Sequence, residues 1–183
     1  MAHYDLNWLR QFYDDKKNVD FLFFWGHTNK TGQPVGPFIF SQWYPSPFTV
    51  DSITYSTAEH WMMTEKARLF GDAEIAERVI GAKTPKEAKE LGRAVRGFDV
   101  AAWEQSCFSI VREGNRHKFI QNAGYKEYLL GTGNRVLVEA SPVDAIWGIG
   151  LAADSAQAKV PHQWRGKNLL GFALMEVRDL LSA

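Results

Sequence analysis

The chain has 183 residues, the length of one ordinary domain, and its 21 basic and 21 acidic side chains give a formal net charge of zero. Hydrophobic residues make up 45% of the chain and charged residues 23%, which excludes a disordered, collagen-like or low-complexity protein. The balanced charge also excludes a general affinity for nucleic acid, which needs a basic excess to neutralise phosphates, and leaves only a local basic patch open.

The N-terminal part of the chain alternates between helical and extended patterns. Residues 3–17 place four apolar side chains at helical spacing, which predicts a helix: Leu6, Leu9, Phe12 and Tyr13. The aromatic run of residues 19–25 predicts a strand, and the glycines and prolines of residues 29–37 predict a loop. Short strands are expected over residues 38–40 and 52–55, on either side of a turn that contains two prolines.

Helices are expected to dominate from Ser56 onward, and most are marked by the residues that begin or end them. Ser56 or Thr57 begins a helix that stops at Gly71, and Thr84-Pro85-Lys86-Glu87 is a capping box with proline in the first helical position. The expected helices cover residues 56–70, 72–81, 84 onward, 99–120, 124–130 and 169–181, with one further strand over residues 135–139.

These elements predict an α+β fold that is predominantly α-helical, with a few short strands that lie mostly near the N-terminus. No repeat and no linker-like run divides the chain, so we expect a single domain over residues 1–183. The first helix is expected within residues 1–18, and the core of the domain from about residue 21 to residue 182.

Several kinds of protein are excluded by what the sequence lacks. Cys107 is the only cysteine, and its place on the apolar stripe of a predicted helix favours a core residue over a nucleophile. No segment has the roughly 20 apolar residues of a membrane span, and the first residues lack a signal-peptide pattern, so we expect a cytoplasmic protein without membrane contact. Scattered histidines and the absence of a glycine-rich phosphate loop predict neither a metal nor a cofactor.

The segment 55–61 is the first candidate for chemistry. Ser56 and Glu59 fit a capping box, and in that interpretation Glu59 only closes the start of a helix. The helical spacing favours another interpretation. Glu59, Met63 and Lys66 lie on one face of the helix, and Glu59 and Lys66 are seven residues, or about 10.5 Å, apart along its axis. That separation is too long for a tight ion pair and suits a ligand lying along the helix, with Lys66 on a phosphate and Glu59 at the reacting sugar.

Two more candidates lie in the predicted helices that follow. Trp103 fits either the core, since it shares a stripe with Cys107, or a stacking platform for a flat base. Arg93, after Gly92, is either a second phosphate contact or an exposed helical arginine.

The C-terminal third contains two glycine-rich segments, 141–150 and 164–171. Asp144 in the first is either a turn residue or an acid, and the glycines beside Trp147 would let the backbone approach a ligand closely. Asn168 in the second is a candidate helix N-cap, and the basic loop that runs into this helix start is a candidate anion site.

Taken in order along the chain, these motifs resemble those of the NADAR family, also called YbiA-like. Each motif is short, and the ordered set is what makes the resemblance specific; it covers the chain from about Phe23 to Leu181. The residues that carry it are Ser41-Gln42-Trp43, Thr57-Ala58-Glu59-His60 with Lys66, Gly92-Arg93, Trp103-Glu104, Asp144-Ala145-Ile146-Trp147-Gly148-x-Gly150 and Gly166-Lys167-Asn168-Leu169-Leu170-Gly171.

The resemblance implies an α-rich N-glycosidase. Substrates known for the family are phosphoribosylated pyrimidine intermediates of riboflavin biosynthesis and, in other branches, ADP-ribose linked to guanine, which extends to ADP-ribosylated guanine in DNA. The family's catalytic carboxylates match Glu59 and Asp144, and its base-stacking tryptophan matches Trp103. The further substrate-binding residues expected on this basis are Lys66, Arg93, Trp147, Gly148 and Asn168.

This chain departs from the family pattern at two places. Many members have an acid between the last two glycines of the Trp-Gly-x-Gly motif, where this chain has Ile149, so a second acidic helper is missing. The Gly- and Pro-rich insert from His27 to Phe48 differs from the shortest members, which bears on the size of the substrate.

Three functions remain open on the sequence alone. The first is a metal-independent N-glycosidase that takes a small nucleotide-like substrate. The second is a non-catalytic NAD- or ADP-ribose-binding module, which the presence of both Glu59 and Asp144 disfavours, because a binder of anionic phosphates gains little from two carboxylates. The third is an α+β interaction domain whose aromatic residues only form the core.

Overall fold

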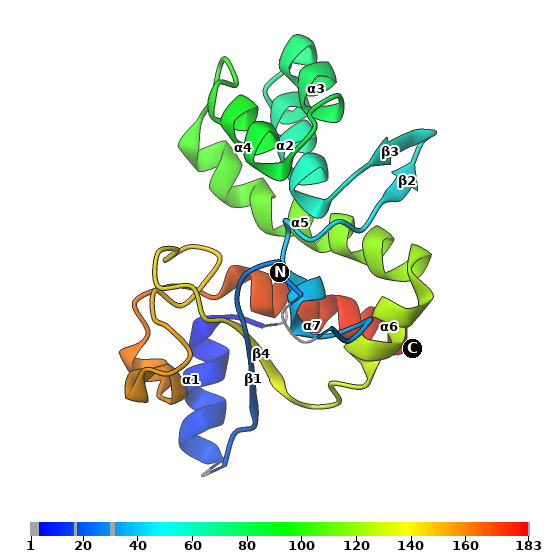
Figure 1. Ribbon diagram of the computed structural model, residues 1–183. Helices are drawn as coiled ribbons and strands as arrows, with labels where there is room; N and C mark the ends of the chain where they lie inside the picture. Colours follow the sequence, from blue (N-terminus) through cyan, green and yellow to red (C-terminus); the bar gives the residue numbers. More distant parts are fainter. Residues whose placement is uncertain (1–3, 17, 30–31, 183) are drawn as a thin grey trace. The chain divides into compact units, whose positions relative to one another are not determined.

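The structure, a computed structural model, describes residues 4–16, 18–29 and 32–182 (Figure 1). The chain forms two compact units. Residues 42–123 form one of them, here called the inserted unit, and residues 1–41 together with 124–183 form the other, here called the terminal unit. Helices with a few short strands make up both, which confirms the predicted fold class. The expectation of one domain with a core over residues 21–182 stays a prediction.

In the inserted unit, three helices pack around α2 (Figure 1). A hairpin precedes them, in which β2 pairs antiparallel with β3. The elements are β2 (Phe48–Val50), β3 (Ile53–Tyr55), α2 (Ala58–Leu69), α3 (Ala73–Ile80), α4 (Pro85–Arg93) and α5 (Val100–Gln121). Helix α2 contacts α3, α4 and α5, so the residues along it are held from several sides.

The helices of this unit begin at residues whose side chains accept a hydrogen bond from the first turn. Such caps satisfy backbone N–H groups that have no partner within the helix. The N-caps are Thr57 for α2, Asp72 for α3, Thr84 for α4 and Asp99 for α5. The starts predicted at Asp72, Thr84 and Asp99 are therefore confirmed.

A hydrophobic cluster joins the hairpin to α2 and α5. Its buried members are Phe48, Tyr55, Ala58 and Trp61. The Trp61 indole N–H donates to the carbonyl of Ile110 at 2.9 Å. A Cβ atom at Gly114 would overlap the Trp61 ring, so α5 approaches α2 closely only because this position is glycine. This packing fixes α2, which carries Glu59 and Lys66, against α5, which carries Trp103.

The strand prediction was wrong at two places, one at the end of the first segment of the terminal unit and one in the hairpin of the inserted unit. Residues 38–40 form part of a buried 3₁₀ turn, η1 (Pro37–Phe40), because Pro37 presets a helical φ and the amide of Ile39 donates to Gly36. Strand β2 was missed. Its hairpin turns at Asp51 and Ser52, which both have positive φ (47° and 65°), and neither is the glycine or asparagine that normally marks such a turn.

In the terminal unit, two strands far apart in the sequence pair in parallel. Strand β1 (Phe21–Phe24) pairs with β4 (Val136–Glu139), and α7 (Leu169–Ser182) packs against β4. The remaining elements are α1 (Leu6–Asp15), α6 (Ala123–Leu130) and two 3₁₀ turns, η2 (Ala156–Lys159) and η3 (Pro161–Gln163). The strands predicted over 19–25 and 135–139 and the helices predicted over 3–17, 124–130 and 169–181 are confirmed apart from their ends, of which residues 3 and 17 lie outside the described residues.

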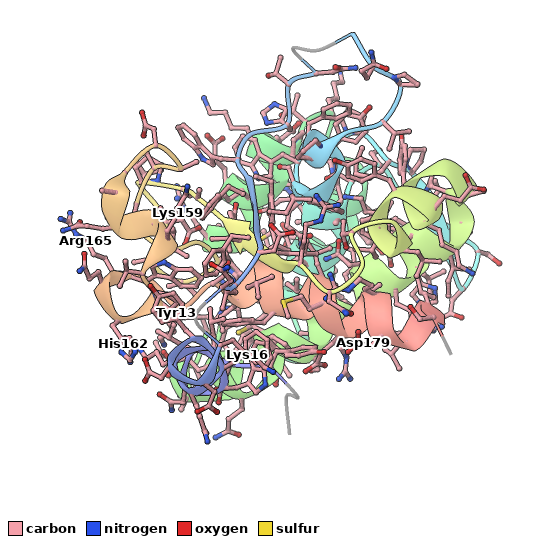
Figure 2. The ribbon with its side chains drawn as sticks, turned by 90° about the horizontal axis from the view of Figure 1, so that it is seen from below. Tyr13, Lys16, Lys159, His162, Arg165 and Asp179 are labelled. Carbon is pink, nitrogen blue, oxygen red and sulfur yellow. The ribbon has the colours of Figure 1, made fainter. Side chains whose placement is uncertain are left out.

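The first helix is fastened to the C-terminal part of the chain. Figure 2 shows Tyr13 of α1 beside His162 of η3, and their ring centroids are 6.3 Å apart. His162 Nε2 lies 2.9 Å from a carboxylate oxygen of Asp14. At the other end of α1, the Tyr4 hydroxyl donates to Asp179 at 2.6 Å. Among the described residues, no helix is both long and apolar enough to cross a membrane.

Candidate active site

Helix α2 begins at Thr57, which caps its first turn. Thr57 Oγ1 accepts from the backbone N–H of His60 and lies 2.8 Å from His60 Nδ1. Because His60 Nε2 lies 3.1 Å from the carbonyl of Ala82, which can only accept, a neutral ring protonated at Nε2 satisfies both contacts. Burial lowers the pKa of His60, which favours that neutral form. The N-cap is therefore Thr57 and not Ser56, so the capping box predicted for Ser56 and Glu59 is wrong.

Glu59 is a buried acid in the first turn of α2. Its side chain is 5% exposed. Its backbone N–H donates to the carbonyl of Gln42 at 3.0 Å, so a residue 17 positions earlier fixes the backbone from which this carboxylate projects. A carboxylate at a helix N-terminus lies at the positive end of the helix dipole. The helix dipole therefore stabilises a negative charge at Glu59, whereas the burial of the residue opposes one.

Lys66 lies in the last turn of α2 and is held by three neighbours. Its ammonium donates to the carbonyl of Gly92 at 2.8 Å, and it lies 4.2 Å from the ring centroid of Phe98 and 5.6 Å from that of Trp103. Burial, and then the positive charge of Arg93, lower the pKa of Lys66. An anion bound here would oppose both effects.

The Gly92–Arg93 motif has a packing explanation. A Cβ atom at Gly92 would overlap Met63, so glycine lets α4 come close enough to α2 to bring its carbonyl to Lys66. Arg93, one residue later, is exposed. The glycine is therefore structural, and the arginine is a second cation near Lys66.

Trp103 lies in the first turn of α5 and is neither fully buried nor fully exposed. Cys107, one turn later on the same stripe, is 5% exposed and belongs to the core, as expected. Trp103 is thus attached to the core and still presents part of its ring. Phe98, which sequence reasoning missed, adds a second ring that is 42% exposed.

In the terminal unit, Asp144 organises a turn. Its Oδ1 accepts hydrogen bonds of 2.8 Å from the backbone N–H groups of Ile146 and Trp147, and its carbonyl accepts from Gly150 at 3.1 Å. Its other carboxylate oxygen, Oδ2, makes no hydrogen bond with the residues that the structure describes. The turn interpretation of Asp144 is therefore confirmed, and one oxygen is left for another role.

The two glycine-rich segments bind each other through their backbones. Carbonyls of the first accept from N–H groups of the second in five hydrogen bonds: Arg165 to Ile149, Lys167 to Ala145, Asn168 to Gly148, Leu169 to Ile146 and Leu170 to Trp147. A Cβ atom at Gly166 would overlap the carbonyl of Gly148, so this contact needs glycine. These bonds use the N–H groups of Leu169 and Leu170 at the start of α7, which leaves fewer backbone donors for an anion there, and the anion site stays a prediction.

Asn168 holds this pair of segments to strand β4. It is completely buried, its Oδ1 accepts from the N–H of Glu139, and its Nδ2 donates to the carbonyl of Leu137, both at 2.9 Å. Its φ of 55° lies in the left-handed region, which asparagine tolerates better than most residues. The side chain binds the strand and does not cap α7, so that expectation was wrong. Whether Asn168 also contacts substrate stays a prediction.

The departure at Ile149 has a structural counterpart. The Ile149 side chain is fully buried, and its N–H donates to the carbonyl of Glu139. Beside it, Gly148 is buried, and a Cβ atom there would come within 2.8 Å of the same carbonyl. Trp147 remains partly exposed. Position 149 therefore stabilises the loop through an apolar contact.

The eight predicted site residues fall into two groups. The inserted unit holds Glu59, Lys66, Arg93 and Trp103, with Lys66 directly beside Trp103. The terminal unit holds Asp144, Trp147, Gly148 and Asn168, which all belong to the paired segments. Within the described residues, no group of three or more His, Cys, Asp and Glu side chains could hold a metal ion.

Sequence reasoning also missed three buried polar residues. Lys118 on α5 is completely buried, and burial lowers its pKa to about 7. Gln42 and Asn115 are buried and joined by a hydrogen bond of 2.8 Å. Gln42 lies in a motif that carried the resemblance, which was the available signal, whereas Lys118 looked like an ordinary helical lysine.

Comparison with known proteins assigns the family. Residues 23–182 match the NADAR domain. The chain belongs to the NADAR family. It is 44% identical over 164 residues to N-glycosidase R617 of Acanthamoeba polyphaga mimivirus, which covers 87% of this chain and 95% of the relative. It is 32% identical over 143 residues to N-glycosidase YbiA of Escherichia coli, covering 78% and 81%.

A solved structure agrees with this assignment. The NMR structure of E. coli YbiA superposes with a TM-score of 0.71 at 28% identity, covering 89% of this chain and 85% of that one. The NADAR resemblance deduced from the ordered motifs is thereby confirmed.

Proposed function

We propose that this NADAR protein is an N-glycosidase, a hydrolase that cleaves the bond between a base and a ribose in a phosphorylated, nucleotide-like substrate. The enzyme class follows that of the related N-glycosidases. The proposed substrates are phosphoribosylated pyrimidine intermediates of riboflavin biosynthesis or ADP-ribose linked to guanine, including guanine in DNA. The proposed reaction needs no metal.

The reaction sets clear chemical demands. When the C1′–N bond breaks, its electrons leave with the base and positive charge develops on the sugar. A carboxylate stabilises that charge, and a carboxylate also takes a proton from the attacking water, whose oxygen becomes the C1′ hydroxyl. The base takes up a proton, so one water is consumed and free base and sugar are released. Two carboxylates suffice for this chemistry.

One observation supports the proposal most strongly. A single helix has a buried acid in its first turn and, in its last turn, a lysine whose ammonium lies beside two aromatic rings. Glu59 is 5% exposed in the first turn of α2, and Lys66 in the last turn is held beside the Trp103 ring. A ligand lying along the helix would put a sugar at Glu59 and a phosphate at Lys66, with Trp103 available to a flat base. Exposed Arg93 would add a second phosphate contact.

Asp144 is proposed as the second carboxylate, on different grounds. Its Oδ1 is held by two backbone N–H groups, which fixes the orientation of the carboxylate. A fixed carboxylate with a remaining oxygen suits a base that must meet a water in one direction. Trp147, Gly148 and Asn168 are proposed to support this residue and to contact substrate from the same pair of segments.

The same contacts of Asp144 favour a second candidate function, a non-catalytic ADP-ribose-binding module. In that case Asp144 would only stabilise its turn, and Glu59 would be the one remaining candidate among the two proposed carboxylates. The proposed test distinguishes the two functions directly. The protein is incubated with a phosphoribosylated pyrimidine and with guanine-linked ADP-ribose, and released base and sugar are quantified. Release from either substrate supports the enzyme, whereas tight binding of both without release supports the binding module.

A further inference from the structure

The segment that carries Gln42 connects three helices of the inserted unit. The Gln42 carbonyl accepts the N–H of Glu59 on α2 at 3.0 Å, and its side-chain Oε1 accepts from Asn115 Nδ2 on α5 at 2.8 Å. The next residue, Trp43, has the ammonium of Lys89 on α4 5.8 Å from its ring centroid. Gln42 is therefore the link between α5 and the backbone of Glu59.

Asn115 fixes the far end of this link. It is completely buried, and its Nδ2 also donates to the carbonyl of Val111 at 2.9 Å. Because a carbonyl can only accept, this contact sets which way the Asn115 amide points and leaves the second Nδ2 hydrogen for Gln42. Hydrogen bonds therefore connect Val111 through Asn115 and Gln42 to the backbone of Glu59.

The link is unfavourable for stability in one respect. Gln42 Nε2 and Asn115 Oδ1 are both buried, and neither has a hydrogen-bond partner among the described residues. A buried donor or acceptor without a partner destabilises the folded state, and an apolar residue of the same shape would avoid that penalty. Two such atoms in one pair suggest that the pair serves something other than stability.

We infer that Gln42, held by Asn115, is a positioning residue for the carboxylate of Glu59. The inference rests on the proposed function, in which Glu59 acts at the reacting sugar. Gln42 touches the backbone of Glu59 and determines where its side chain projects. Displacement of a reacting group by about 1 Å is enough to slow a reaction on the order of 100-fold.

The test compares variants that remove the link with one that removes an unrelated buried polar atom. Asn115→Leu and Gln42→Met each abolish the hydrogen bond between the two side chains, and Gln42→Met leaves the backbone carbonyl in place. Thr64→Val is the matched control, because the Thr64 hydroxyl on α2 is also buried without a partner. Gln42→Met and Thr64→Val each remove a buried polar atom that has no partner, so both are expected to raise the melting temperature or leave it unchanged. Asn115→Leu leaves the Gln42 side-chain oxygen unpaired and is expected to lower the melting temperature, so melting curves are recorded for every variant.

The kinetic result separates positioning from packing. For Asn115→Leu and Gln42→Met, kcat is expected to fall roughly 10- to 100-fold with KM within about twofold of the wild type, and the double variant is expected to lose no more than either single one. Thr64→Val is expected to keep the wild-type kcat. Unchanged kcat in Asn115→Leu, or an equal loss in Thr64→Val, would overturn the inference.

A second measurement does not depend on turnover. Native-state hydrogen exchange of the Glu59 amide is expected to speed up about tenfold or more in Asn115→Leu and Gln42→Met and to stay unchanged in Thr64→Val. Equal exchange rates in all variants would show that the link does not hold Glu59. Full activity in Glu59→Gln would instead contradict the proposed role of Glu59, so failure of the proposed function and failure of the positioning inference give different results.

Discussion

The two units use their polar residues in different ways. In the inserted unit, the candidate groups are side chains: a buried carboxylate at Glu59 and an ammonium at Lys66 held between aromatic rings. In the terminal unit, the polar side chains bind backbone groups: Asp144 holds its own turn, and Asn168 holds its segment to strand β4. Substitutions in the inserted unit should therefore change catalysis and binding, and those in the terminal unit should first change stability.

The largest expected effect concerns Glu59. Glu59→Gln keeps the size of the side chain and removes its charge, so kcat is expected to fall roughly 100-fold or more. Because Thr57 caps α2, the substitution leaves the helix cap in place, and the melting temperature should change little. Turnover and melting curves measured on one preparation check both parts, and near-wild-type turnover would remove Glu59 from the catalytic residues.

The matching substitution in the terminal unit is Asn168→Ala. It leaves the carbonyl of Leu137 and the N–H of Glu139 without their side-chain partner, and each buried group left unpaired costs roughly 1–3 kcal/mol in unfolding free energy. Urea denaturation measures the loss. Asn134→Ala, at an exposed asparagine of the same unit, is the control and should stay within about 0.5 kcal/mol of the wild type. A stable Asn168→Ala protein with weakened substrate binding would show instead that Asn168 acts on the substrate.

Substitution of Trp103 tests whether the candidate residues of the inserted unit form a binding surface or part of the hydrophobic core. Trp103→Ala is expected to weaken substrate binding by about 1–3 kcal/mol, and Trp103→Phe should retain much of the affinity. Since the ring is only partly buried, unfolding should lose less than the roughly 3–5 kcal/mol typical of a core tryptophan. Calorimetry measures the substrate affinity and melting curves measure the stability of the same samples, and the two results together separate a binding role from a core role. A full core-sized loss of stability with unchanged affinity would assign Trp103 to the core.

Lys66 gives a smaller effect that depends on charge. Lys66→Ala is expected to raise KM for a phosphorylated substrate about tenfold, equivalent to about 1.4 kcal/mol, and less so at high salt. KM for a matching nucleoside without phosphate should hardly change, and Lys86→Ala, at an exposed lysine of α4, should behave as wild type. Equal KM increases for both substrates would show that Lys66 does not hold a phosphate.

The same residue predicts a pH dependence. Burial and Arg93 lower the pKa of Lys66, so its charge is lost at a pH below that for an ordinary lysine. In the wild type, KM for the phosphorylated substrate should therefore rise as the pH increases through the lowered pKa. This rise should be absent in Lys66→Ala. A pH profile of KM that is identical in both proteins would contradict this assignment.

The smallest expected effect is that of metal removal. Exhaustive chelation should leave the rate unchanged, because the proposed chemistry uses carboxylates. Rates are measured before and after chelation, and recovery of a lost rate by zinc or magnesium would reveal a metal requirement.

Local sequence signals predicted most helices and the family, and they failed where distant contacts decide. Asp72, Thr84 and Asp99 are helix starts that can be deduced from neighbouring residues alone. Gln42 gave no such indication, because its partners lie 17 and 73 positions away. The short apolar run at residues 38–40 became a 3₁₀ turn because a run of that length does not distinguish helix from strand.

The sequence predicted which residues belong to the candidate site better than it predicted the contacts of those residues. Lys66 was expected on one face with Glu59, but its bond to Gly92 depends on close packing of α4 that no spacing reveals. Asp144 and Asn168 were each recognised as residues with two possible roles. Asp144 binds backbone groups only two and three residues away, as a turn residue does, whereas the backbone partners of Asn168 lie 29 and 31 residues away and reach it only through folding.

The most direct test of the proposed function is hydrolysis in ¹⁸O-labelled water, followed by mass spectrometry of both products, with wild-type protein and Glu59→Gln side by side. Cleavage of the N-glycosidic bond by water predicts free, unlabelled base and a sugar product carrying one ¹⁸O at C1′, formed by the wild type and not measurably by Glu59→Gln over the same time. Substrate that binds but is recovered intact, or products formed equally by both proteins, would contradict an N-glycosidase that acts through Glu59.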